Sequence, residues 1–134
     1  MKVLPDTSIW VEFLRHGTAG PAAALDGLLA KGSVVVCGPV ISELLVGAAP
    51  EDHDELWGTV GSLPWADIDR EGWKTIGQVG GRLRKRGLSL PLTDVVIAVA
   101  SVTSGAALWS DDQDFGRIAD VYPGLELFSA PGSN

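Results

Sequence analysis

Short apolar runs alternate with helix-like patterns along the whole chain. Five runs of apolar residues are short enough for strands, and they lie at residues 3–4, 34–36, 65–68, 106–109 and 125–128. Between them, apolar residues recur at helical spacing over residues 8–14, 21–30, 39–46, 51–60, 70–86, 94–102 and 115–118. Strands that alternate with helices are typical of an α/β fold. The pattern therefore predicts a mainly parallel central sheet of four to five short strands flanked by helices.

Two of these helices carry clear apolar faces. The segment 94–102 is apolar nearly all round, which predicts a central, buried helix. In the segment 70–86, apolar positions recur at helical spacing at Trp73, Ile76, Val79 or Gly80, and Leu83, and Gly87 ends the pattern. We expect at least three of the five tryptophans to lie in the core.

Length and composition indicate one globular domain. The chain has 134 residues, of which 46% are hydrophobic and 20% charged, enough to bury a core. We expect a single domain over residues 1–128 and a flexible C-terminal tail over 129–134. No apolar run reaches the roughly 18 to 20 residues that a membrane span needs, and residues 1–6 lack the apolar region of a signal peptide, so a soluble cytoplasmic protein is expected. The single cysteine, Cys37, follows three valines and is expected to be a buried apolar group.

The net charge of −7 argues against binding nucleic acid through a broadly basic surface. Phosphate contacts normally come from clustered lysine and arginine. A phosphodiester bridged by a metal ion stays possible, because a divalent cation reverses the local field that a phosphate meets.

Acidic residues stand where apolar segments end or helices begin. They are Asp6, Glu43, Asp94 and the group Asp111, Asp112 and Asp114. Open α/β sheets bind ligands beyond the carboxyl ends of their strands, which predicts that these side chains share one pocket. Oxygen ligands of this kind favour Mg²⁺ or Mn²⁺.

Each acidic residue also has a purely structural interpretation. Asp6 is placed to cap a helix, and Glu43 could lie on a solvated helix face. Asp94 would be favoured by the helix dipole, and the aspartates after residue 109 are typical of a turn before a helix. The prediction of a site rests on their combination.

The order of four motifs resembles the PIN-domain ribonucleases, specifically VapC-type toxins. The motifs are Val3-Leu4-Pro5-Asp6-Thr7-Ser8-Ile9-Trp10, Val40-Ile41-Ser42-Glu43-Leu44, Leu92-Thr93-Asp94-Val95-Val96-Ile97-Ala98 and Leu108-Trp109-Ser110-Asp111-Asp112-Gln113-Asp114-Phe115. The resemblance covers nearly the whole chain. It implies a three-layer PIN-like fold and an endoribonuclease dependent on Mg²⁺ or Mn²⁺. It also implies a cognate VapB-type antitoxin that blocks the acidic pocket, and a homodimer.

The resemblance also assigns site residues. Asp6, Glu43 and Asp94 match the first three family acids, and either Asp112 or Asp114 is the fourth. Asp111 would add a further negative charge beside the pocket, and Ser110 stands in place of a common threonine. The hydroxyl that follows the first acid falls on Thr7 or Ser8, which are candidates for contact with the RNA substrate, although both could equally cap a helix.

Our hypothesis for the mechanism divides these acids into two groups. Asp6, Asp94 and Asp112 would bind one or two metal ions, while Glu43 or Asp114 orients the attacking water.

Cations for RNA contact are few. Arg82, Arg84 and Arg86 at the end of the segment 70–86 are candidates, although a helix C-terminus favours cations through its dipole alone.

Two other functions remain open. A catalytically inactive PIN-like protein-binding module would share the fold without the chemistry. An aspartyl-phosphate enzyme would also cluster acids at strand ends, but it would usually have a second aspartate at the position of Ser8.

Overall fold

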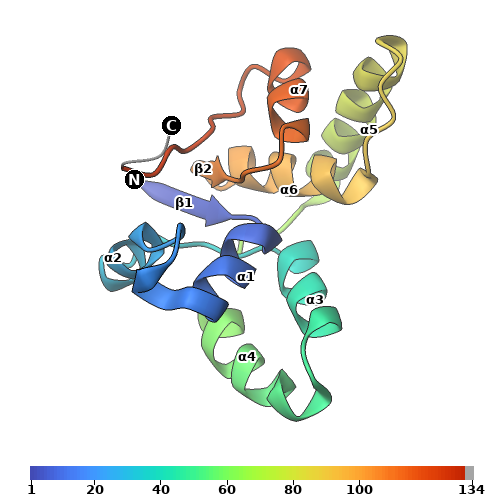
Figure 1. The fold of residues 1–134 in the computed structure, drawn as a ribbon. Coiled ribbons are helices and arrows are strands. Elements are labelled where there is room, and N and C mark those ends of the chain that lie inside the picture. The colour runs from blue at the N-terminus through green and yellow to red at the C-terminus, as the bar shows by residue number, and fades with distance from the viewer. Residues whose placement is uncertain (132–134) are drawn as a thin grey trace.

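A parallel pair of strands forms the centre of the molecule (Figure 1). The computed structural model describes residues 1–131. Strand β1 (Lys2–Pro5) pairs with β2 (Ala106–Trp109), and the register runs from Lys2 beside Ala106 to Pro5 beside Trp109. Both strands are buried apart from Lys2 and the half-buried Ala107, so they form the floor of the core.

Three further segments extend this sheet through single parallel bridges. Val34 lies beside Val3, Trp65 beside Val36, and Leu127 beside Leu108. The order of parallel segments across the sheet is therefore 65, 34–36, β1, β2 and 127. The predicted parallel sheet is confirmed, but the prediction of four to five strands is wrong for regular strands, since two are found in the described part of the chain. The other three predicted strands form only isolated bridges, two from residues 34–36 and one each from Trp65 and Leu127.

Helices pack on both sides of the strands. Those in the first half of the chain are α1 (Thr7–His16), α2 (Ala24–Ala30), α3 (Gly38–Gly47) and α4 (His53–Thr59), with short 3₁₀ turns at Gly17–Ala19, Pro50–Asp52 and Val60–Ser62. Those in the second half are α5 (Arg70–Lys85), α6 (Leu92–Thr103) and α7 (Asp114–Val121). In Figure 1 the first group lies below the strands and the second above them, which gives the three layers expected of a PIN-like fold.

Helix α6 is the centre of the upper layer. All of its residues from Val95 to Ser101 are buried, as the nearly uniform apolar pattern predicted. The hydroxyl of Ser101 donates to the carbonyl of Ala98 at 2.7 Å, which satisfies the one polar side chain in this stretch.

Sequence patterns placed some helix ends and some tryptophans wrongly. The predicted helix over 21–30 begins at Ala24, and the one over 51–60 has 3₁₀ turns at both ends. Only Trp10 and Trp109 are buried, whereas Trp57, Trp65 and Trp73 are 54%, 37% and 56% exposed. Helical spacing cannot distinguish a core position from one at the edge of the apolar face.

The remaining expectations for the fold concern Cys37, the membrane and the tail. Cys37 is 1% exposed, and burial raises the pKa of its thiol to about 11, consistent with a structural role. Among residues 1–131, no helix is both long and apolar enough to cross a bilayer. In the tail predicted for 129–134, Ala130 is 8% exposed, and residues 132–134 lie outside the described part of the chain.

Truncation of Leu108 should destabilise the fold strongly. Leu108 is fully buried in β2, so Leu108→Ala should lower the free energy of unfolding by about 2–5 kcal/mol. Leu127→Ala is the control, because Leu127 lies beside Leu108 in the sheet but is 48% exposed. The Leu127 substitution should lower the free energy of unfolding by less than half as much. Urea denaturation measures both, and equal losses would show that the two positions bury comparable apolar surface.

Candidate metal centre

Asp6 is fixed at the carboxyl end of β1. Its backbone N–H donates to the carbonyl of Trp109 at 2.9 Å, which ties the end of β1 to the end of β2. Its carboxylate oxygen Oδ1 accepts hydrogen bonds from the Ser8 hydroxyl at 2.7 Å and the Ile9 N–H at 3.1 Å, and Oδ2 accepts one from the Ser110 hydroxyl. Asp6 therefore caps helix α1, as the structural interpretation of the sequence predicted. It is at the same time a buried carboxylate with a fixed orientation.

Glu43 reaches the same place from α3. It is exposed, and its Oε1 accepts a hydrogen bond from the Thr7 hydroxyl at 2.9 Å. This bond joins the first turn of α1 to α3, although the two residues are 36 positions apart in the sequence. Thr7 therefore positions Glu43, while Ser8 positions Asp6.

Asp94 enters from the first turn of α6. Burial, and then repulsion from Asp112, Asp114, Glu43 and Asp6 in that order of effect, together raise its pKa from 3.8 to about 6. The dipole of the helix N-terminus favours the ionised carboxylate, but it does not outweigh burial and repulsion. Asp94 is thus the carboxylate that responds most directly to the crowding of negative charge.

Asp112 and Asp114 follow β2 in a hydrogen-bonded turn. The Ser110 hydroxyl accepts from the Asp112 N–H at 2.9 Å, and the Asp112 carboxylate accepts from the Asp114 N–H at 2.9 Å. Asp114 also forms an ion pair with Arg117, one turn further along α7, at 2.5 Å. The turn brings both aspartates back towards α6.

These acids share one cavity of about 190 Å³. Its lining consists of Asp6, Thr7, Ser8, Glu43, Asp94, Ile97, Asp112 and Phe115. Carboxylate oxygens of Asp94, Asp112 and Asp114 all lie within 4.8 Å of one another, so Asp114 belongs to the same cluster. The three carboxylates that lie within this distance are those of Asp94, Asp112 and Asp114. The hypothesis from the sequence had named Asp6, and not Asp114, as the third metal ligand.

The donor set fits a hard divalent cation. Two carboxylates about 4 Å apart repel by about 4 kcal/mol at the effective dielectric typical of a protein surface. The pocket lining contains no lysine or arginine, and the ion pair of Arg117 with Asp114 at its edge offsets only part of this repulsion. Oxygen ligands alone, with space left for water, suit Mg²⁺ or Mn²⁺ rather than a metal that prefers nitrogen or sulfur.

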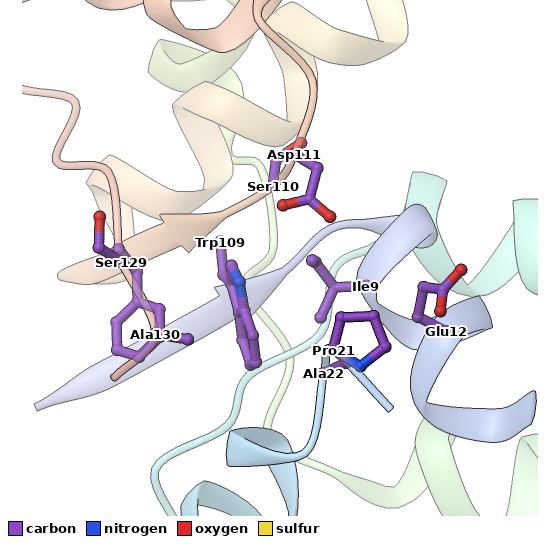
Figure 2. A pocket seen from close by; sticks show the side chains of 10 residues that line it. Ile9, Glu12, Pro21, Ala22, Trp109, Ser110, Asp111, Ser129 and Ala130 are labelled. Carbon is purple, nitrogen blue, oxygen red and sulfur yellow. The ribbon is translucent and has the colours of Figure 1, made fainter. Parts of the chain in front are cut away.

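Asp111 points to a different cavity. With Glu12 it lines a cavity of about 210 Å³ whose walls include Trp109, Phe128 and Pro21. Figure 2 shows Asp111 and Glu12 among the side chains of this cavity. The charge of Asp111 is therefore not part of the lining of the acidic pocket, contrary to what its position in the motif indicated.

The arginines predicted to contact RNA lie outside the pocket lining. Arg82 donates from its guanidinium to the carbonyl of Val121 at 3.2 Å, so it caps the last turn of α7. Arg84 lines a separate groove beside α5. Arg86 follows the last residue of α5 and is exposed.

Sequence reasoning missed the part played by Ser110. It was recognised only as a replacement for threonine, yet its hydroxyl donates to Asp6 and accepts from the backbone of Asp112. One side chain thus joins the two acidic motifs. A hydroxyl two residues before an aspartate, directly after a strand, is the signal that could have revealed it.

Comparisons with known proteins agree with this architecture. The family model described as "PIN domain" matches residues 3–121. Ribonuclease VapC18 of Mycobacterium tuberculosis is 30% identical, over 87% of this chain and 86% of that protein.

Solved structures share the fold. DNA-bound VapBC from Salmonella typhimurium has a TM-score of 0.76 at 21% identity, covering 96% of this chain and 97% of that chain. VapBC2 from Rickettsia felis, bound to a DNA fragment from its promoter, gives 0.73 at 21% identity over 96% and 98%. FitAcB from Neisseria gonorrhoeae gives 0.68 at 18% identity over 95% and 96%. The resemblance seen in the four motifs is confirmed, and the chain belongs to the PIN-domain family.

Proposed function

We propose that this chain is a divalent-metal-dependent endoribonuclease and the toxin of a toxin–antitoxin pair. The observation that carries the proposal is the meeting of Asp6, Glu43, Asp94 and Asp112 in one small pocket, with Asp114 at its edge. Membership of the PIN-domain family and the likeness to a VapC ribonuclease support it.

Asp94, Asp112 and Asp114 would hold the cation, because their oxygens are the closest set. Asp6 would complete the site from the opposite strand, with its orientation held by Ser8 and Ser110. The chemistry that Mg²⁺ or Mn²⁺ supplies when bound is Lewis-acid activation of water and of the phosphoryl oxygens.

Glu43 would orient the attacking water. It is exposed, whereas Asp6 is buried and Asp94 is half-buried, and the Thr7 hydroxyl fixes one of its oxygens. A carboxylate held in this way can accept a proton from water at a defined point. Thr7 and Ser8 act here as positioning residues, and direct contact of either with RNA stays a prediction.

The partners follow from the same proposal. RNA is the substrate, and phosphate would approach the pocket through the bound cation, since cationic side chains are missing from the pocket lining. RNA contact by Arg82, Arg84 and Arg86 stays a prediction. A cognate antitoxin of the VapB type would act by covering the pocket, and the chain would work as a cytoplasmic homodimer.

Replacement of Asp94 should abolish cleavage. Asp94→Asn and Asp6→Asn each remove a carboxylate from the pocket, so the rate of metal-dependent RNA cleavage should fall at least about 100-fold, the scale of losing an electrostatic group at a catalytic centre. Asp111→Asn is the matched control, because it removes the same charge from the same surface but from a different cavity, and it should cleave at the parental rate. Cleavage of a labelled RNA with Mg²⁺, Mn²⁺ or EDTA measures all three. Parental activity in Asp94→Asn would refute the site.

Addition of Mn²⁺ should stabilise the protein. At 100 times its Kd, a ligand that binds only the folded state adds about 2.7 kcal/mol. Thermal unfolding should therefore shift upwards with Mn²⁺ in the parent and in Asp111→Asn, but not in Asp112→Asn. A parent that binds no metal in this assay would favour the inactive binding module instead.

Proton and metal should compete at Asp94. Because its folded pKa of about 6 lies above the unfolded value of 3.8, the folded state binds the proton more tightly. Without metal, the protonated Asp94 therefore contributes fully to the free energy of unfolding below about pH 4, and this contribution is lost as the pH rises through about 6. Affinity for Mn²⁺ should conversely fall, by roughly tenfold for each pH unit below 6.

Asp94→Asn provides the check on this linkage. In EDTA it should raise the melting temperature relative to the parent at pH 7 and leave it nearly unchanged at pH 4. We expect a gain of about 1 kcal/mol at pH 7, since partial exposure screens the repulsion. A gain of the same size at pH 4 would mean that charge is not its cause.

A further inference from the structure

Arg117 brings a positive charge to the edge of the acidic pocket. Its Nη1 forms an ion pair with Oδ1 of Asp114 at 2.5 Å, and the two side chains are 47% and 25% exposed, respectively. A carboxylate oxygen of Asp114 lies within 4.8 Å of carboxylate oxygens of Asp94 and Asp112. A single carboxylate therefore separates the guanidinium of Arg117 from the other two candidate ligands of the cation.

The position of Arg117 in its helix does not explain its presence. Helix α7 begins at Asp114, so Arg117 lies in the first turn, where the positive end of the helix dipole disfavours a cation. Arg82, Arg84 and Arg86 lie at or just after the end of α5, where the dipole favours them. Ion pairs one turn apart on an exposed helix surface add little stability. Local helix energetics therefore account for the arginines of α5 better than for Arg117.

Most of the hydrogen-bonding capacity of Arg117 is unused. A guanidinium carries five N–H donors in a planar fork. Within residues 1–131 the side chain of Arg117 makes one hydrogen bond, which goes to Asp114. The side chain is 47% exposed, so a ligand in solvent can reach it. Because a planar fork of donors matches two oxygens of a phosphate group, Arg117 can keep its bond to Asp114 and bind a phosphate at the same time.

The pocket lining itself offers no basic side chain to a phosphate group. Its charged residues are Asp6, Glu43, Asp94 and Asp112, all of them acids, and they repel an anion. Among residues 1–131, Arg117 is the one lysine or arginine that forms an ion pair with a carboxylate of this cluster. An anion that approaches the cation site from the side of α7 therefore meets the guanidinium of Arg117.

We propose that Arg117 contacts the substrate of the proposed ribonuclease, by binding a phosphate group of the RNA at the edge of the acidic pocket. Asp114 holds the guanidinium in place before the RNA arrives, so less side-chain freedom is lost on binding. The N–H groups that Asp114 leaves free then donate to phosphate oxygens. The inference rests on the proposed function and adds to it a residue for phosphate contact.

Binding of a labelled single-stranded RNA tests this contact without cleavage. Fluorescence anisotropy is measured with Mn²⁺ in a Glu43→Gln background, which removes the group proposed to orient water and keeps Arg117 and the carboxylates of the closest cluster. Addition of Arg117→Gln should raise the Kd for RNA by about tenfold, the scale of one hydrogen bond to a charged group. The slope of log Kd against log salt concentration should decrease by about 0.7, the value for one phosphate contact on a single strand.

Arg70→Gln is the matched control. Arg70 is also an exposed arginine in the first turn of a helix, α5, and it is not part of the lining of the acidic pocket. It changes the net charge by the same amount, and it should leave the Kd for RNA and the salt slope as they are in the Glu43→Gln background. Equal weakening by both substitutions would assign the effect to net charge and overturn the proposal. Unchanged RNA binding in Arg117→Gln would overturn it as well.

Affinity for Mn²⁺ separates contact with the substrate from an indirect effect through Asp114. If Arg117 acted only by orienting Asp114, Arg117→Gln in the otherwise parental chain should weaken Mn²⁺ binding, measured by thermal unfolding, and leave the KM for RNA unchanged. For a phosphate contact, the KM should instead rise about tenfold, while Mn²⁺ affinity is kept or increased because a competing positive charge is removed. Weakened Mn²⁺ binding with a parental KM would therefore overturn the proposal.

Failure of this contact and failure of the proposed function give different results. A parent that neither binds nor cleaves RNA refutes both, whereas a parent that cleaves RNA, together with an Arg117→Gln variant of parental KM, refutes the contact alone. Circular dichroism verifies the fold of each variant. Arg117→Met, which keeps the apolar stem of the side chain, replaces Arg117→Gln if that variant does not fold.

Discussion

Repulsion between carboxylates held in one small pocket is the constraint on which the rest of this structure depends. Asp94 shows it most clearly, since burial and four acidic neighbours raise its pKa to about 6. The fold must hold these groups together against a force that would separate them. It does so by holding them on separate segments, namely the end of β1, the helices α3 and α6, and the hydrogen-bonded turn between β2 and α7.

Backbone geometry provides most of that rigidity. The carboxyl ends of β1 and β2 are joined by the bond from Asp6 N–H to the Trp109 carbonyl, and Ser110 joins the Asp6 carboxylate to the turn after β2. Asp94 stands at the start of the most buried helix. Local capping and the assembly of the pocket are therefore one set of hydrogen bonds, because the donors that cap α1 also orient the acid that faces the cation site.

The acidic pocket and the groove beside α5 lie in separate regions of the surface. The acidic pocket lies beside the carboxyl ends of β1 and β2, the first turns of α1 and α6, and the middle of α3. The groove and four of the ten lysine and arginine residues, at 82–86, belong to α5 and the connection after it. Arg82, a candidate for RNA contact, donates a hydrogen bond to the last carbonyl of α7. The cations at the end of α5 therefore lie outside the lining of the acidic pocket.

Sequence alone determined the element types, the buried helix α6, the family and the acids that converge. Those features follow from local periodicity and from the rule that parallel strands end at one edge of a sheet. Short sequence motifs are therefore enough to predict them. Tertiary structure decided that Asp114 joins Asp94 and Asp112, that Asp111 faces another cavity, and that Trp73 stays outside the core. Adjacent aspartates in one turn have nearly identical sequence context, and only the packing of that turn against α6 determines which carboxylate points into the pocket. In the same way, helical spacing gives the direction of a side chain about its own helix, but only the neighbouring elements determine whether anything covers it.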